Sequence, residues 1–259
     1  MSLLEGLLRA ELAAFSLEVV RIAGLVLVAP LPWTWAPARV RAGLVLALAL
    51  AGHSFSGTAG LPSAPEAIAL AASGEFLLGA AIGFIVRMAV AVAEIAAEVI
   101  APQMGLGVAQ LFDPKDGASM SVLAQLFRYL AILLAVLVGV HRVVINALIT
   151  SFQVFPVGHV PNPGLAFEVI LRMSADILAA GVRIAIPMIA VLFMTQIALA
   201  FISRAAPAMQ IFSVGFAVTL AVGSVVLVLM IPDTGYRLLA EFSRVGPQIE
   251  SILMAMAGG

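Results

Sequence analysis

Apolar residues are grouped along the chain into long stretches with short polar breaks between them. The stretches cover about 12–29, 40–51, 67–100, 122–149, 167–202 and 209–231. They show no strand-like alternation and no internal repeat. Apolar runs near 20 residues are typical of helices that cross a membrane. The pattern therefore predicts an all-α fold of membrane-associated helices and helical hairpins, in a single domain over 1–259.

The segment from about 236 to 256 has a different pattern. Its apolar residues recur at helical spacing along one side: Leu238, Leu239, Phe242, Val245, Ile249, Ile252 and Leu253. Such spacing is typical of an amphipathic helix. We therefore predict an amphipathic helix over about 236–256.

The break after the first apolar stretch holds two tryptophans among prolines. Trp33 and Trp35 lie between Pro30 and Pro37. Tryptophan is enriched where a membrane meets water, so this break is interpreted as an interfacial turn. The stretch that follows, 40–51, is short for a spanning helix.

Composition places the chain in the membrane class. Hydrophobic residues make up 63% of its 259 positions and charged residues 10%, against about 45–50% and about 25% in soluble domains. The surplus apolar surface must face lipid or neighbouring subunits. The net charge of −1 gives no indication of a nucleic-acid partner, and the absence of cysteine excludes disulfides, thiolate chemistry and sulfur metal sites. Arginines are scattered through the apolar stretches, so charge counting predicts no topology.

Four charged residues lie inside the third apolar stretch: Glu75, Arg87, Glu94 and Glu98. Arg87, Glu94 and Glu98 fall on one helical face at 100° per residue. A charge at bilayer depth costs at least ~2.5 kcal/mol, so this face is expected to contact protein or water. It is interpreted as a subunit seam or the wall of a polar conduit; the alternative is a set of ion pairs between helices of this chain.

Two further pairs of opposite charge are spaced about one helical turn apart. They are Glu18 with Arg21, and Arg172 with Asp176. This spacing allows a local ion pair on a helix surface. For Arg172 and Asp176 the expectation is a pair that holds helices of one chain together.

Small residues recur at four-residue steps in two stretches. They are Gly79 and Gly83 in the third stretch, and Gly215, Thr219 and Gly223 in the sixth. Such spacing allows helix backbones to approach closely. We expect these positions to mark close helix packing.

The segment between the third and fourth stretches is unusual for a solvated loop. It is rich in glycine and apolar residues, and these positions stand out: Gln103, Met104, Gly105, Leu106, Val108, Leu111, Phe112, Asp113 and Pro114. Methionine adapts to irregular gaps, and glycine allows a chain to fold back. Such a segment could plug a hole, or pack as a re-entrant hairpin in the protein's own core. The residues alone favour neither interpretation.

The same segment resembles a known family. Gln103-Met104-Gly105 followed by Phe112-Asp113-Pro114 resembles the signature of the FliR family of type III export-apparatus proteins. Further blocks resemble the family in the same order: Arg21-Ile22-Ala23-Gly24, Gly139-Val140-His141, Ser151-Phe152, Phe155-Pro156-Val157-Gly158, and Arg204 to Phe212. The block from Val214 to Leu220 is similar to the flagellar branch, although Ala217 stands where that branch has proline.

The resemblance implies a role in protein export. The family resembles a fusion of FliP and FliQ and assembles with them into a pore complex in the bacterial inner membrane, at the flagellar basal body. It implies that residues 103 to about 119 plug the closed pore. FlhA-like and FlhB-like components, unfolded export substrates and membrane lipid are the other implied partners. Cofactors are not implied.

Catalytic and metal-binding functions find little support in the sequence. His53, His141 and His159 lie far apart, with no carboxylate at ligand spacing. No serine is placed as the nucleophile of a recognisable triad, and no nucleotide-binding loop is present. The chain is therefore predicted not to be an enzyme. The alternatives are a small-solute secondary transporter that uses Arg87, Glu94 and Glu98, and an export-gate homologue of the virulence branch.

Overall fold

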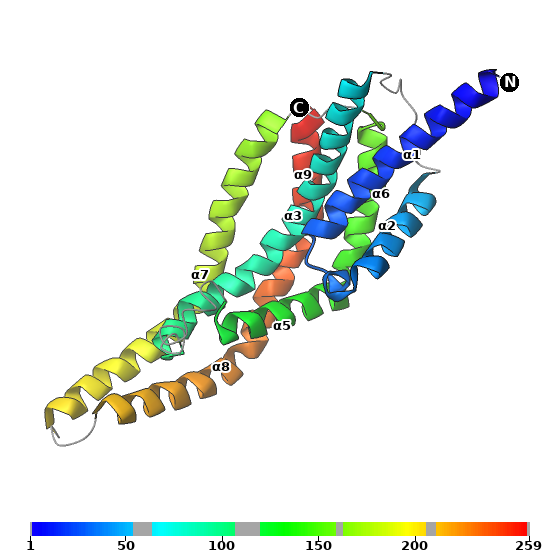
Figure 1. The fold of residues 1–259 in the computed structure, drawn as a ribbon. Helices are drawn as coiled ribbons and strands as arrows, with labels where there is room; N and C mark the ends of the chain where they lie inside the picture. Colours follow the sequence, from blue (N-terminus) through cyan, green and yellow to red (C-terminus); the bar gives the residue numbers. More distant parts are fainter. Residues whose placement is uncertain (1, 54–63, 107–119, 159–162, 206–210, 258–259) are drawn as a thin grey trace. The chain divides into compact units, whose positions relative to one another are not determined.

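The computed structural model describes residues 2–53, 64–106, 120–158, 163–205 and 211–257 (Figure 1). All the regular elements in these residues are helical, which confirms the predicted all-α class. They are α1 (Ser2–Val28), the 3-10 helix η1 (Pro32–Trp35), α2 (Ala38–Gly52), α3 (Pro65–Gln103), α5 (Val122–Val138), α6 (Val140–Val154), α7 (Pro163–Ala205), α8 (Ile211–Ser243) and α9 (Val245–Ala257).

Two helix boundaries differ from those predicted by the apolar stretches. The fourth stretch is not one helix, because it breaks at Gly139, whose φ is +85°. The sixth does not end near residue 231, since α8 continues through Pro232 to Ser243. The region predicted as one amphipathic helix over 236–256 is therefore the end of α8 followed by α9. Most of the apolar residues predicted for its inner side are buried: Leu238, Phe242, Val245, Ile249, Ile252 and Leu253.

The chain divides into two compact units, and each is described by itself. Unit 1 contains residues 1–88, 135–174 and 242–259, and unit 2 contains 89–134 and 175–241. Helices α3, α5, α7 and α8 each contribute residues to both. The single domain over 1–259 stays a prediction.

In unit 1, α1 packs very closely on α3. A Cβ atom at Gly79 would overlap the carbonyl oxygen of Arg21, and one at Gly83 would lie 2.9 Å from the Leu25 carbonyl oxygen. Larger side chains would therefore force the two backbones apart. Both positions belong to the small-residue spacing seen in the sequence.

In unit 2, glycines of two other helices lie against side chains of the α3 end. A Cβ atom at Gly181 of α7 would lie 2.7 Å from Ile95, and one at Gly223 of α8 would lie 2.8 Å from Met104. Gly215, by contrast, has its nearest neighbour, Leu199, at 4.0 Å. The close approach on α8 is therefore at Gly223.

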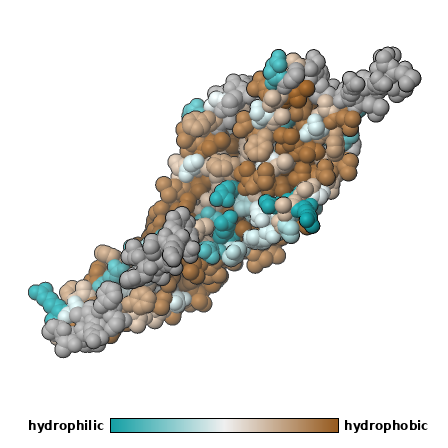
Figure 2. Space-filling model, in the orientation of Figure 1, coloured by the Kyte–Doolittle hydropathy of each residue, from teal (hydrophilic) through white to brown (hydrophobic). Residues whose placement is uncertain are grey.

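Long apolar helices leave much of their surface uncovered by the chain. Within the described residues, three helical stretches are long and apolar enough to cross a membrane, or four if α5 and α6 form one broken span. In the stretch that contains α8, only 6% of the most apolar window is buried. Figure 2 shows the resulting hydrophobic surface on one face of the molecule. Such surface is suited to lipid or to neighbouring subunits.

Candidate functional site

A fully buried ion pair joins α1 to α3 within unit 1. Arg21 of α1 and Glu75 of α3 are both 0% exposed, and Arg21 Nε donates to Glu75 Oε2. The close α1–α3 packing at Gly79 brings the two helices near enough for this contact. A buried charge needs a partner of opposite sign and further hydrogen bonds, and both are present here.

The remaining groups of this pair bind the end of α6 and the segment after it. Arg21 Nη1 donates to Ser151 Oγ at 3.2 Å and Nη2 to the Phe155 carbonyl oxygen at 2.9 Å. The Gly158 amide donates to Glu75 Oε1 at 2.9 Å. The guanidinium carbon lies 4.4 Å from the ring centre of Phe152. We call Arg21, Glu75, Ser151, Phe155 and Gly158 the buried network.

A second carboxylate in α1 is also buried. Glu18 is 0% exposed, and its oxygens lie 3.1 and 3.2 Å from His53 Nδ1. His53 follows α2, and its Nε2 lies 3.4 Å from Glu11 at the exposed side. The Phe15 ring packs edge-on against the imidazole. These contacts join the middle of α1 to the C-terminal end of α2.

These partners differ from the ones that local spacing predicted. The salt bridge of Arg21 is with Glu75, 54 positions away, and Glu18 binds His53. Arg172 pairs with Glu168 at 2.6 Å, so the predicted pair with Asp176 is wrong. Spacing within one helix cannot distinguish the preceding turn from the following one, and it carries no information on contacts between helices.

The sequence did contain a signal for most of the buried network. Arg21, Ser151, Phe155 and Gly158 all belong to the blocks that resemble the FliR family, and these blocks meet in space. Glu75 lies outside the blocks, and the sequence shows it only as a charge within an apolar stretch. Its partner could not be identified without the α1–α3 contact.

The three charged positions predicted as a seam or conduit wall have different environments. Arg87 is exposed and has no ion pair within the described residues. Glu94 pairs with Arg128 of α5 at 3.3 Å, with side chains 17% and 33% exposed. Glu98 accepts a hydrogen bond from the Ser121 amide at 2.9 Å, just before α5. The two glutamates therefore hold the start of α5 against α3, and the seam stays a prediction.

The first residues of the predicted plug form the end of α3. The Gly105 amide bonds to the Pro102 carbonyl and the Leu106 amide to the Ala101 carbonyl, with Gly105 at φ +80°. This is the double-bonded helix ending that a left-handed glycine allows. Val108, Leu111, Phe112, Asp113 and Pro114 lie outside the described residues.

The side chains at this helix end are held within unit 2. Met104 is 2% exposed and packs on Gly223 of α8, while Gln103 Oε1 accepts a hydrogen bond from Gln196 of α7 at 3.2 Å. A Cβ atom at Gly105 would lie 2.9 Å from the Phe216 ring. Residues 103–106 are thus a fixed base for the segment that follows.

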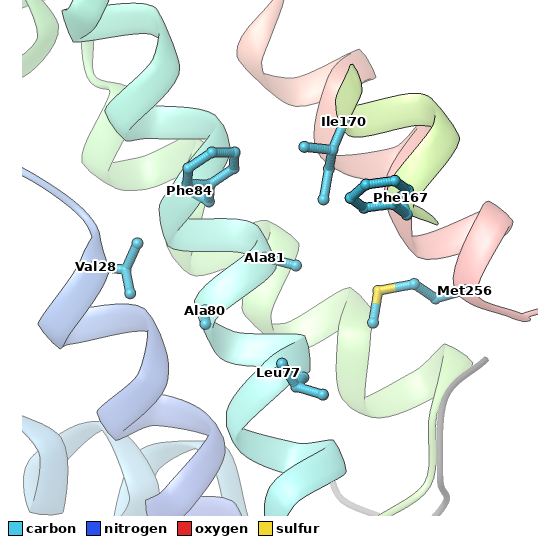
Figure 3. A pocket seen from close by; sticks show the side chains of 8 residues that line it. All are labelled: Val28, Leu77, Ala80, Ala81, Phe84, Phe167, Ile170 and Met256. Carbon is cyan, nitrogen blue, oxygen red and sulfur yellow. The ribbon is translucent and has the colours of Figure 1, made fainter. Parts of the chain in front are cut away.

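Unit 1 also has an apolar groove of about 400 Å³ (Figure 3). Side chains from α1, α3, α7 and α9 line it: Val28, Leu77, Ala80, Ala81, Phe84, Phe167, Ile170 and Met256. This lining offers hydrocarbon contact and supplies neither an acid nor a base. Within the described residues, no group of three His, Cys, Asp or Glu side chains is placed to hold a metal ion.

Comparison with known proteins gives consistent matches. The family model described as "Bacterial export proteins, family 1" matches residues 12–245. The flagellar biosynthetic protein FliR of Pectobacterium carotovorum is 37% identical over 158 residues, 61% of this chain and 60% of the relative. That of Escherichia coli K12 is 34% identical over the same shares. That of Caulobacter vibrioides is 28% identical over 195 residues, 74% of this chain and 78% of the relative.

The family match covers most of the chain and includes every residue of the buried network. The chain spans about three fifths of the length of the first two relatives it matches. It is all-α, with helices apolar and long enough to cross a membrane. The chain belongs to the FliR family of bacterial export proteins.

Proposed function

We propose that this chain is a component of the flagellar protein-export gate in the bacterial inner membrane. The observation that carries this proposal is the family match over residues 12–245, together with relatives that are named flagellar biosynthetic proteins. The protein acts as part of a conduit and not as an enzyme. Loss of the chain from its host should abolish secretion of flagellar subunits, whereas normal secretion would refute the export role.

The gate is proposed to form with FliP-like and FliQ-like subunits, next to FlhA-like and FlhB-like components. The exposed apolar surface supports this assembly, because large side chains such as Leu229, Val228 and Phe201 are more than half exposed. Arg87 supports it too, since an exposed arginine without an ion pair in the described residues is suited to an acidic residue of a neighbouring subunit. Under this proposal Arg87, Glu94 and Glu98 lie near a subunit seam.

The segment up to about residue 119 is proposed to plug the closed pore. Its fixed base, residues 103–106, supports this role, since a plug must be anchored to the wall of its conduit. The family resemblance implies five sealing side chains: Met104, Leu106, Val108, Leu111 and Phe112. Because Met104 is buried against Gly223, we propose that the other four make the sealing contacts.

The plug is tested by shortening the segment without disturbing its base. Replacing residues 107–113 by a short Gly-Ser linker should leave the gate assembled and make the membrane permeable to small ions. The matched control replaces Met104 with leucine, which keeps the buried volume and should leave the membrane tight. An assembled gate with a tight membrane after the 107–113 replacement would refute the plug.

A further inference from the structure

A small pocket lies between α6 and α9 in unit 1. It is lined by Val143, Asn146, Ala147 and Thr150 of α6, and by Gly246, Ile249, Glu250 and Leu253 of α9. Both sets follow the spacing i, i+3, i+4, i+7, so the lining residues of each helix share one face. The two faces meet closely, since a Cβ atom at Gly246 would lie 3.4 Å from Val143. The pocket is therefore formed where two helix faces pack together.

The pocket has an apolar floor and a polar rim. Ile249 and Leu253 are 1% and 2% exposed, which places them at its floor. Asn146, Thr150 and Glu250 are exposed and form its rim. An amide, a hydroxyl and a carboxylate offer several acceptor oxygens, and here they surround one apolar surface.

The three rim side chains are without a hydrogen bond or ion pair to any residue that the structure describes. Glu94 and Glu98 of α3, by contrast, are each held by a group at or just before the start of α5. Arg142 precedes Asn146 by one turn on α6, yet it forms no ion pair with Glu250. The carboxylate of Glu250 is therefore available to a cation that the described residues do not supply.

A guanidinium group suits this pocket better than other cations do. Its flat faces are weakly hydrated and can lie on an apolar floor, and the donors at its edges match a carboxylate. An ammonium group is a strongly hydrated point charge, and a metal ion would need more ligands than one carboxylate supplies. A phosphatidylethanolamine headgroup would also bring its phosphate close to Glu250, where like charges repel.

The size of the pocket favours one inserted side chain. Pockets that hold whole small molecules typically measure about 300–1,000 Å³, and this one measures about 220 Å³. Apolar side chains next to it are open to further contact, since Val143 and Met254 are 37% and 59% exposed. A neighbouring helix can therefore insert one long side chain and pack its own apolar residues around the pocket.

We propose that this pocket receives an arginine side chain from a neighbouring subunit. The guanidinium pairs with Glu250 and donates hydrogen bonds to the side-chain oxygens of Asn146 and Thr150. The pair would fix the α6–α9 face of unit 1 against that subunit. This inference rests on the proposed export gate, because that assembly supplies the neighbouring subunit.

The first test measures how fast subunits leave the purified complex. The full-length chain is extracted with its partners in mild detergent, and the loss of subunits after dilution is followed by native mass spectrometry. E250Q keeps the shape and removes the charge, so it should speed the loss of one subunit at least about tenfold. T150V removes one hydrogen bond and should speed it about fivefold. The matched control E168Q should have no effect, because Glu168 is exposed and already paired with Arg172.

The second test identifies what enters the pocket. A photo-crosslinking amino acid replaces Val143, which lines the pocket without contributing a polar group. The crosslinked peptide should come from another subunit and contain an arginine. Replacing that arginine with glutamine should leave E250Q without further effect on subunit loss. A crosslink only to lipid, or to a segment that lacks arginine, would overturn the proposal.

Unfolding of the isolated chain separates this role from a purely internal one. E250Q should unfold like the parent, because Glu250 has no partner within the described residues. A destabilised chain with unchanged subunit loss would contradict the proposal. An intact complex that loses subunits equally fast with E250Q would overturn the pocket alone, whereas a parent chain recovered with no other subunit would overturn the export gate as well.

Discussion

Replacement of Glu75 by glutamine removes one charge from the buried network and changes little else. The glutamine has nearly the same shape, so helix packing at Gly79 is preserved. Its carbonyl oxygen can still accept the hydrogen bond from the Gly158 amide. Its NH₂ group then faces Arg21 Nε, so two donors meet where a donor and an acceptor met before. Arg21 would be left as a buried charge without a counterion.

The expected loss of stability follows from the burial of both groups. Removing one partner of a buried ion pair costs about 3–5 kcal/mol, because the other charge stays desolvated. Arg21 keeps its hydrogen bonds to Ser151 and Phe155, which places the expected loss near the lower end, about 3 kcal/mol. An exposed pair such as Arg172–Glu168, with side chains 78% and 60% exposed, is worth about 0.3–0.5 kcal/mol.

The assay is reversible unfolding of the purified protein in mixed micelles, followed by helical circular dichroism. Four proteins are compared: the parent, E75Q, R21Q and the double variant. Because the two side chains share one interaction, the double variant should be less destabilised than the sum of the single variants by at least about 1 kcal/mol. R172Q is the control for removal of a charge.

If E75Q unfolds at the same denaturant concentration as R172Q, the Arg21–Glu75 pair does not stabilise the fold. Strict additivity of the R21Q and E75Q effects would also contradict this stabilisation, because the two groups would then not act as a pair.

Three other outcomes follow from the packing. G79A should destabilise the protein by about 1–3 kcal/mol through overpacking. The control G43A, whose Cβ meets nothing within 4 Å, should be neutral or stabilising. Thermal unfolding measures both variants. G105A should cost about 1–2 kcal/mol, since its φ of +80° is unfavourable for alanine, and a stable G105A would contradict the observed helix ending. E94Q should change the free energy of unfolding by no more than about 1 kcal/mol, because the pair of Glu94 with Arg128 is partly exposed. A reduced yield of partner subunits with E94Q would support the subunit seam, and an unchanged yield would count against it.

Most of the helices were predictable from the sequence. A helix that crosses a membrane or packs in a hairpin needs a long apolar stretch, and such stretches are visible in the sequence. The residues at which the helices begin and end were less predictable. Hydropathy falls at Pro232 and Asp233, yet α8 continues, and the Asp233–Arg237 pair at 2.8 Å stabilises the polar turn. Gly139 leaves the apolar pattern unbroken, so the pattern cannot reveal a left-handed residue that separates α5 from α6.

The candidate site was predictable only in part. The spacing of small residues predicts close helix packing at Gly79 and Gly223, because two helix backbones can approach closely only where the side chains between them are small. The charge partners were missed, since Arg21 meets Glu75 through contacts between helices that no local spacing records. The chemistry of an isolated arginine in an apolar stretch shows that it needs a partner, and only the fold shows which one.

The export-gate assignment is tested most directly by the mass of the gently solubilised complex. The chain is tagged, extracted in mild detergent from its host membrane and analysed intact by native mass spectrometry. The account predicts one large assembly in which FliP-like and FliQ-like subunits accompany this chain. Recovery of the chain alone, or only with copies of itself, under conditions that preserve other membrane complexes would contradict it.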